Sequence, residues 1–167
     1  MKLVTYLPGN EERLAMLSGE MLYDMATLHP TLPSTMQAFL NGWDEFYPLA
    51  MARKPKGEGI PVEDTILRSP IPHPASLRDG YAFRQHVSSA RRNRGVDMIA
   101  AFDEFPVFYF GNHLAVQGTG DIYCMPDHFE KLDYELECAI VICRQGTNIP
   151  AAEADQYIGG LMIMNDM

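Results

Sequence analysis

Carboxylates gather at the start of one apolar segment of this chain. In "DYELECAIVI", residues 133–142, Glu135 and Glu137 alternate with Leu136 and lead into an aliphatic run. Successive side chains of a β-strand point to opposite faces, so the two glutamates would share a face, about 6–7 Å apart. Two such carboxylates can converge on a hard cation, and Mg²⁺ and Ca²⁺ prefer oxygen ligands. The alternative is that this end of the strand is only solvated.

Other side chains suited to acid–base or metal chemistry occur in separate segments. Asp166 ends the apolar "IGGLMIMND", and Asp79 precedes His86 by seven residues in "RDGYAFRQH". Seven residues are nearly two helical turns, so Asp79 and His86 could face the same way. Each residue also has a structural alternative: a turn residue for Asp166, a helix N-cap for Asp79 and a hydrogen-bonded structural role for His86. Tyr109, in "FPVFYFGN", could be an ordinary strand aromatic.

The N-terminal elements follow from the hydrophobic pattern. "KLVTYL" predicts a first strand, and "RLAML" and "EMLYDM", joined by Ser-Gly, predict a hairpin. "STMQAFLNGWDEFYPLAMARK" has helical spacing, with Ser34 as its N-cap and a break at Asn-Gly. The proline- and glycine-rich "KPKGEGIPVEDTILRSPIPHPA" predicts a connection between two domains, an N-terminal module over residues 1–70 and a second domain over residues 71–167.

The second half begins with a predicted helix and continues in short strands. "SLRDGYAFRQHVSSARRNRG" would place Asp79, Phe83, His86 and Ala90 on one helical face. "VFYFGN", "LAVQG", "YELECAIVIC" and "YIGGLMIMND" predict strands. Within residues 133–142, the face opposite the two glutamates carries leucine, cysteine and isoleucine, and it is predicted to be the core face.

Composition excludes several classes of protein. The 167 residues are 47% hydrophobic and 21% charged, which is typical of a globular protein. The net charge of −9 argues against nucleic acid as a partner, because phosphate binding needs a basic surface. No stretch approaches the roughly 20 apolar residues of a membrane helix, and the N-terminus lacks a secretory signal pattern. Three cysteines without metal-type spacing indicate reduced thiols and a cytoplasmic setting.

Five motifs in one order carry a resemblance. "RDGYAFRQH", "FPVFYFGN", "GTGD", "LDYELECAIVI" and "IGGLMIMND" together resemble the fumarylacetoacetate hydrolase family over roughly Ile71 to Met167. The preceding module resembles the small β-rich domain of fumarylacetoacetase-like members. The resemblance implies an α+β, mainly β fold, in which the β-rich module precedes a mixed β-sandwich roll. It also implies a homodimer, Mg²⁺ or Ca²⁺ as cofactor, and hydrolysis of a carbon–carbon bond in a 1,3-diketo acid, as in aromatic amino acid catabolism.

The resemblance assigns roles to individual residues of this sequence. His86 matches the histidine that activates water, Tyr109 matches a tyrosine that contacts the substrate, and Arg94 is the candidate for a further anion contact. Four carboxylates match the family's metal ligands: Asp79, Glu135, Glu137 and Asp166.

Some positions depart from the family pattern. Gly80 stands where an aromatic residue usually follows the aspartate, Met167 where tryptophan usually follows "ND", and Cys143 where glycine is common. The chain is expected to be the front part of a longer protein. Two alternatives to the hydrolase therefore stay open: an oxo-acid decarboxylase, hydratase or isomerase on the same scaffold, and a non-catalytic metal-binding relative.

Overall fold

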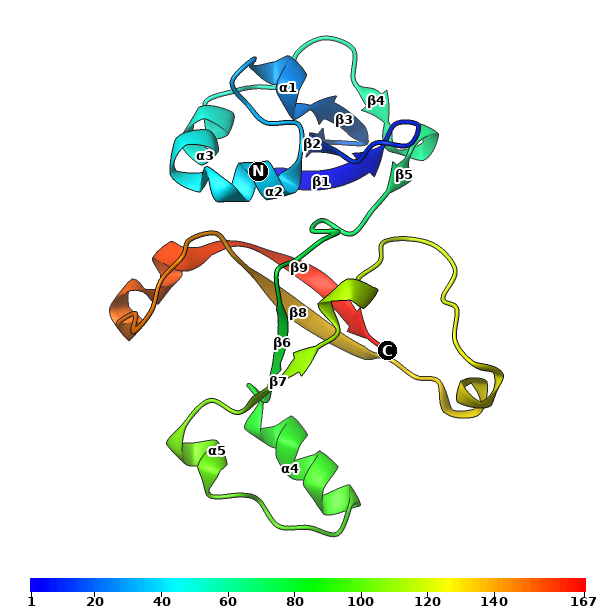
Figure 1. The fold of residues 1–167 in the computed structure, drawn as a ribbon, viewed down its shortest axis with the longest axis vertical. Helices are drawn as coiled ribbons and strands as arrows, with labels where there is room; N and C mark the ends of the chain where they lie inside the picture. The colour runs from blue at the N-terminus through cyan, green and yellow to red at the C-terminus, as the bar shows by residue number, and fades with distance from the viewer. The chain divides into compact units, whose positions relative to one another are not determined.

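The computed structural model describes all residues, Met1–Met167, and mixes α-helices with β-strands (Figure 1). The chain divides into two compact units. One comprises Met1–Pro72 and Gln117–Met167, and the other comprises His73–Val116. The domain boundary expected from the sequence stays a prediction. None of the helices combines the length and the apolar character that crossing a lipid bilayer requires.

An antiparallel sheet of five strands forms the N-terminal part of the first unit. The strands are β1 (Lys2–Leu7), β2 (Arg13–Ser18), β3 (Met21–Asp24), β4 (Ile60–Pro61) and β5 (Ile66–Leu67), and they lie in the order β4-β3-β2-β1-β5. The first strand and the hairpin predicted from the sequence are confirmed. Gly19, with φ of 59°, adopts the left-handed conformation that the tight turn of this hairpin requires.

The proline-rich segment after residue 53 is more than the predicted connection. It contains a 3-10 helix, η1 (Val62–Asp64), and strands β4 and β5, which close the two edges of the sheet. The segment therefore contributes strands to the sheet in addition to its predicted role as a connection. Proline lacks a backbone N–H, but an edge strand needs hydrogen bonds on one side only, so Pro61 is tolerated there.

Three short helices pack on this sheet. They are α1 (Met25–Leu28), α2 (Met36–Asn41) and α3 (Trp43–Met51). Their buried side chains meet those of β2 in one apolar cluster of seven residues: Leu14, Met16, Met25, Leu32, Met36, Phe39 and Ala50. The ring of Phe39 contacts Trp43 edge-on, with ring centroids 5.9 Å apart. This cluster is the main core of the chain.

The predicted helical segment is confirmed, but its N-cap is not Ser34. The side chain of Thr35 accepts a hydrogen bond from the backbone N–H of Ala38 at 3.3 Å, so Thr35 caps α2. The predicted break at Gly42 is confirmed. A Cβ at Gly42 would lie 2.3 Å from the Phe46 ring, so any larger residue in the turn between α2 and α3 would require that ring to move.

A buried carboxylate ties β1, β2 and α1 together. Asp24 accepts hydrogen bonds from the Tyr6 hydroxyl at 2.8 Å, from Arg13 at 2.5 and 2.9 Å, and from the backbone N–H of Ala26 at 3.0 Å. Burial and the bond to Asp24 raise the pKa of Tyr6 to about 12. Burial alone would raise the pKa of Asp24, but the hydrogen bonds from Arg13 and Tyr6 hold it below its ordinary value.

The second unit is a two-stranded ladder with two helices. Its elements are β6 (Leu77–Gly80), α4 (Arg84–Asn93), α5 (Ala101–Glu104) and β7 (Phe108–Gly111), and β6 pairs antiparallel with β7. The ionic pair of Arg84 with Asp103 links the start of α4 to α5. Gly95, with φ of 69°, follows the end of α4.

Two predictions about this unit are wrong. Asp79 lies in β6, not on the helix, which begins only at Arg84. Gly80 is a poor helix former, and the pairing of β6 with β7 outweighs the apparent helical spacing. "LAVQG" forms no strand, because the Asn112 side chain accepts from the Leu114 N–H and supports a 3-10 helix, η2 (His113–Ala115).

A second two-stranded ladder completes the first unit. Strands β8 (Glu135–Ile142) and β9 (Ile158–Asp166) pair antiparallel, as predicted. The 3-10 helix η3 (Pro126–Lys131) precedes β8, and η4 (Ala151–Tyr157) leads into β9.

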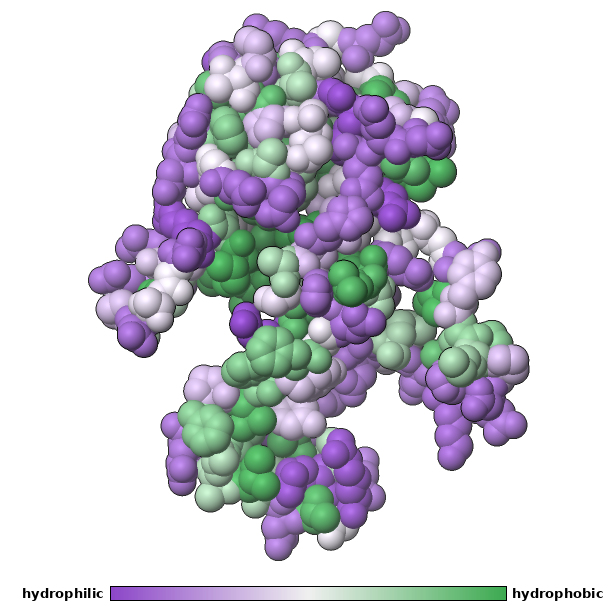
Figure 2. Space-filling model, in the orientation of Figure 1, coloured by the Kyte–Doolittle hydropathy of each residue, from purple (hydrophilic) through white to green (hydrophobic).

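The predicted core face of β8 is exposed. Leu136 and Ile140 are 71% and 56% exposed, and Ile163 of β9 is 77% exposed. The opposite face is the half-buried one. An apolar strand face becomes a core only when another layer covers it, and the core of this unit lies instead between the five-stranded sheet and its helices. Hydrophobic groups therefore reach the surface beside charged ones (Figure 2).

Candidate metal centre

The register of β8 and β9 places three acidic residues at one end of one ladder face. Glu135 pairs with Asp166, and Glu137 pairs with Met164. Side chains of directly opposed residues lie on the same face of an antiparallel ladder, and residues two apart on one strand share that face. The two glutamates and the aspartate therefore belong to one face, which is the relationship predicted from "YELE" and "MND".

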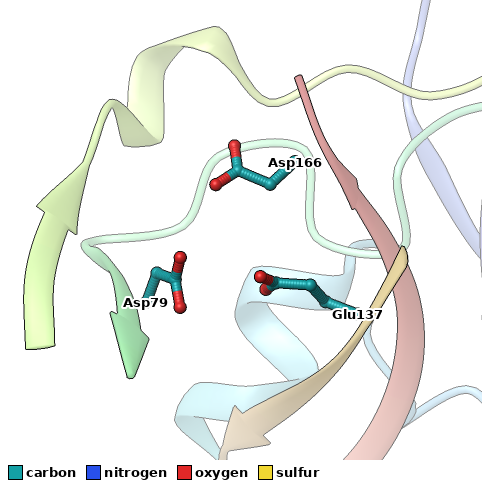
Figure 3. Close-up of side chains that lie close together, drawn as sticks. All are labelled: Asp79, Glu137 and Asp166. Atoms are coloured by element: carbon teal, nitrogen blue, oxygen red, sulfur yellow. The ribbon is translucent and has the colours of Figure 1, made fainter. Parts of the chain in front are cut away.

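Two of these carboxylates approach closely. One oxygen of Glu137 lies within 4.8 Å of one oxygen of Asp166, and both residues are half-buried (Figure 3). Divalent cations bind oxygen at about 2.0–2.6 Å, so two ligands of one ion can stand up to about 5 Å apart. The pair thus fits a hard cation in both spacing and donor type.

Glu135 occupies a different position in the same face. It is exposed, and although it opposes Asp166 in the ladder it is outside the close carboxylate pair. The sequence pattern predicts the same environment for Glu135 and Glu137, whereas in the structure Glu135 is exposed and Glu137 is half-buried. Glu135 is the first residue of β8, and Glu137 lies inside the strand.

The second unit brings Asp79 beside Tyr109. These two residues oppose each other in the β6–β7 ladder, so their side chains emerge on one face. Asp79 is half-buried and Tyr109 is 46% exposed. The sequence predicts Asp79 and His86 on one helical face and contains no signal that links Asp79 to Tyr109.

The remaining predicted residues lie on or next to α4. His86 is exposed, and the following residue, Val87, is the buried residue that anchors the helix. Arg94 is the C-cap residue, and its backbone N–H donates to the carbonyl of Ala90. His86 is thus positioned by a helix packed through Val87, and Arg94 stands two turns further on.

Two features escaped sequence reasoning. Arg78 lies over the rings of Phe108 and Phe110, at 5.7 and 4.9 Å from their centroids, on the face of the ladder opposite Asp79. The alternation in "LRDG" could have predicted that Arg78 and Asp79 point apart. Gly159 is skipped in the pairing of β9 with β8. Adjacent glycines inside an apolar strand are a known signal of such a bulge.

Comparisons with known proteins agree with the resemblance. Residues 76–167 match the family model described as fumarylacetoacetate hydrolase, C-terminal. The oxaloacetate tautomerase YisK of Bacillus subtilis is 29% identical over 153 residues, which cover 82% of this chain and 48% of that protein. The chain spans about half the length of the curated relatives it matches.

Solved structures share the fold. A protein from Mycobacterium smegmatis superposes with a TM-score of 0.78 at 21% identity, over 99% of this chain and 55% of the other. The maleylpyruvate hydrolase of Sphingobium sp. SYK-6, in complex with manganese(II) and pyruvate, gives a TM-score of 0.67 at 16% identity, over 99% of this chain and 58% of the other. At these identities the likeness establishes the fold alone.

Proposed function

We propose that this chain, which belongs to the fumarylacetoacetate hydrolase family, acts on a 1,3-diketo or 2-oxo acid with the help of a divalent cation. The observation that carries the proposal is the β8–β9 register, which puts Glu135, Glu137 and Asp166 on one face. The close carboxylate oxygens of Glu137 and Asp166 support a metal site there.

Asp79 is the third ligand in this proposal. It belongs to the motif "RDGYAFRQH", on which the family resemblance rests. Carboxylate oxygens suit Mg²⁺, Ca²⁺ and Mn²⁺ alike, so the donor set selects a class of ion and not one ion. The manganese(II) of the Sphingobium relative falls in that class.

The chemistry of such a site follows from its charge. A bound divalent cation would act as a Lewis acid and would stabilise negative charge on the oxygens of an oxo acid. Tyr109 shares a ladder face with Asp79, and in this proposal its hydroxyl would donate to the substrate from that face. His86, an exposed residue on α4, would supply the imidazole that moves a proton in this reaction.

Hydrolysis is the first candidate reaction. It needs a base that takes a proton from the attacking water, and neutral imidazole is the side chain best suited to that step at pH 7. His86 supplies the imidazole, within the motif "RDGYAFRQH". The maleylpyruvate hydrolase with the same fold acts on a substrate of this chemical class.

Keto–enol tautomerisation is the second candidate. The 29% identical Bacillus relative is an oxaloacetate tautomerase, and that reaction moves one proton without breaking a carbon–carbon bond. Here His86 or Tyr109 would shuttle the proton, and no water would need activation. Both reactions require the carboxylate face to hold a cation that stabilises negative charge on the substrate oxygens.

Product analysis distinguishes the candidates. The protein is incubated with Mn²⁺ and either an acylpyruvate or oxaloacetate, with EDTA in a parallel sample. Two smaller acids from acylpyruvate indicate hydrolysis, and a faster keto–enol shift of oxaloacetate without any change in mass indicates tautomerisation. Either result should disappear with EDTA. The absence of any metal-dependent change in both substrates would contradict the proposal.

A further inference from the structure

We infer that a bulge at Gly159, clamped by Trp43 and Cys143, sets the register that aligns the acidic face of the β8–β9 ladder. The inference rests on the proposed function, since it explains how the carboxylates of the proposed metal site are positioned. The three residues touch neither metal nor substrate in this account, so they are positioning residues.

The ladder itself locates the bulge. From Glu135 to Val141 every residue of β8 has a partner on β9, ending with Val141 opposite Gly160, but Ile142 pairs with Ile158. Gly159 is therefore an extra residue on β9. A β-bulge of this kind changes which residues face each other on either side of it.

The register beyond the bulge decides which residue opposes Glu135. Because side chains alternate along a strand, a slip of one residue moves every side chain to the other face. If β9 slipped by one position, Asn165 or Met167 would replace Asp166 opposite Glu135, and Asp166 would leave the face that carries Glu137. The alignment of the acidic residues therefore depends on one bulge at the other end of the ladder.

Gly159 is held in place by close packing. A Cβ built on Gly159 would lie 2.7 Å from the Cβ of Cys143 and 3.4 Å from two ring atoms of Trp43. The first distance is shorter than side chains tolerate, so any residue other than glycine would push the strands apart. Gly160, the next residue, has open space at the same position.

The partners of Gly159 are themselves fixed. The backbone N–H of Cys143 donates to the carbonyl of Tyr157 at 2.9 Å, which ends the ladder just past the bulge, and Cys143 is only 6% exposed. Trp43 stacks on Tyr47, with ring centroids 4.5 Å apart. These contacts leave the bulge little freedom to move along the strand.

An ion pair connects the same regions. Arg144, next to Cys143, donates from Nε to Asp44 at 2.9 Å, and Asp44 follows Trp43 in α3. Two neighbouring residues of α3, Trp43 and Asp44, thus contact the end of the β8–β9 ladder that carries the bulge. The module therefore supports the strand register at the carboxylate site, although it contributes no carboxylate to that site.

Two adjacent glycines allow a matched test. Gly159→Ala and Gly160→Ala each add one methyl group to β9, and only the first meets Cys143. The first readout is a cross-link that needs no metal. Cys138 opposes Ile163 on the exposed face, so Ile163→Cys should form a disulfide with Cys138 only in the native register. Cys124 is replaced by serine throughout to avoid competing links.

The second readout is the affinity for Mn²⁺, measured from the free-ion signal in electron paramagnetic resonance. We expect Gly160→Ala to cross-link and to bind Mn²⁺ as the parent does. We expect Gly159→Ala to lose most of the Cys138 cross-link and to bind Mn²⁺ about 10- to 100-fold more weakly, the usual effect of disturbing groups that orient metal ligands. Adding Cys143→Gly removes the opposing Cβ and should restore both.

The outcomes separate the inference from the proposed function. If Gly159→Ala cross-links and binds Mn²⁺ like Gly160→Ala, the clamp does not set the register and the inference is overturned. If the cross-link fails in Gly159→Ala and returns with Cys143→Gly, while the parent binds no Mn²⁺, the clamp holds and the metal proposal fails. A Gly159→Ala protein that is unfolded by circular dichroism, and that Cys143→Gly does not rescue, also counts against the clamp.

Discussion

Glu135 and Asp166 stand directly opposite each other in the β8–β9 ladder, and one carboxylate oxygen of Glu137 lies within 4.8 Å of Asp166. Like charges this close repel one another, and a divalent cation bound between them would offset that repulsion. The acidic face is therefore the feature that most directly suggests a function.

His86 is predicted to transfer a proton during the reaction and not to bind the metal. His86→Asn should lower metal-dependent turnover by about 10²- to 10⁴-fold, the usual contribution of a positioned acid–base group, and should leave Mn²⁺ affinity unchanged. Turnover and Mn²⁺ titrations on the same preparation test both parts. Ser89→Ala, on the same helix, serves as the control. Parent-like turnover of both acylpyruvate and oxaloacetate by His86→Asn would show that the histidine is structural.

Tyr109 is predicted to contact the substrate through its hydroxyl. Tyr109→Phe keeps the ring in β7 and removes one hydrogen bond, which is worth about 0.5–1.5 kcal/mol, so KM should rise roughly two- to tenfold. Steady-state kinetics with the preferred oxo acid measure this change. Phe110→Leu, on the opposite face of the same strand, should leave KM as it is. Equal effects of the two substitutions would indicate a role in packing alone.

The stability of the N-terminal module should depend on pH through Asp24. The pKa of Asp24 is lowered in the folded state. The ionised carboxylate therefore contributes fully to the free energy of unfolding above its ordinary pKa of 3.8, and this contribution is lost as the pH falls through the folded-state pKa. Asp24→Asn should lower the free energy of unfolding at pH 7 by about 1.5–3 kcal/mol, since it removes the negative charge that strengthens the hydrogen bonds from Arg13 and Tyr6.

Urea unfolding at pH 7, 4 and 3 tests the sign of this effect. The difference between the parent and Asp24→Asn should shrink below pH 3.8, because the carboxylate of the unfolded parent binds a proton there before the folded one does. Asp64→Asn, an exposed aspartate in η1, should show no such loss at pH 7. A difference that stayed constant from pH 7 to pH 3 would contradict the assignment.

The cap of α2 gives a small and specific prediction. Thr35→Ala removes the side-chain acceptor for the Ala38 N–H and should cost about 1 kcal/mol of unfolding free energy. Ser34→Ala should cost much less, because only the backbone carbonyl of Ser34 is used, by the N–H of Leu14. Thermal unfolding of the two variants side by side checks the assignment. The reverse order of stability would restore Ser34 as the cap.

Local periodicity was enough to predict the strands that carry the acids. In "YELECAIVI" and "IGGLMIMND" the alternation of side chains placed Glu135 and Glu137 on one face, and the pairing with β9 agrees. The same logic failed for the core face of β8. Alternation shows that two faces differ, but it does not show which face another layer covers, and Leu136 is 71% exposed.

Pairing between distant segments could not be predicted from spacing. Asp79 fits a helical face in the sequence, but its strand pairs with β7 and brings it beside Tyr109, thirty residues away. The bulge at Gly159 depends on Cys143 and on Trp43, which lies more than a hundred residues earlier. Such contacts are set by the tertiary structure, and a single sequence carries only the glycine pair as a hint.

The affinity of the carboxylate face for a divalent cation tests the central claim most directly. Mn²⁺ is titrated into the parent, into Glu137→Gln, into Asp166→Asn and into Glu153→Gln, an exposed glutamate of η4 that serves as the control. The account predicts one site in the parent and in Glu153→Gln, and affinity weakened at least tenfold in the other two, since each loses a charged ligand. Equal Mn²⁺ affinity in all four proteins would contradict it.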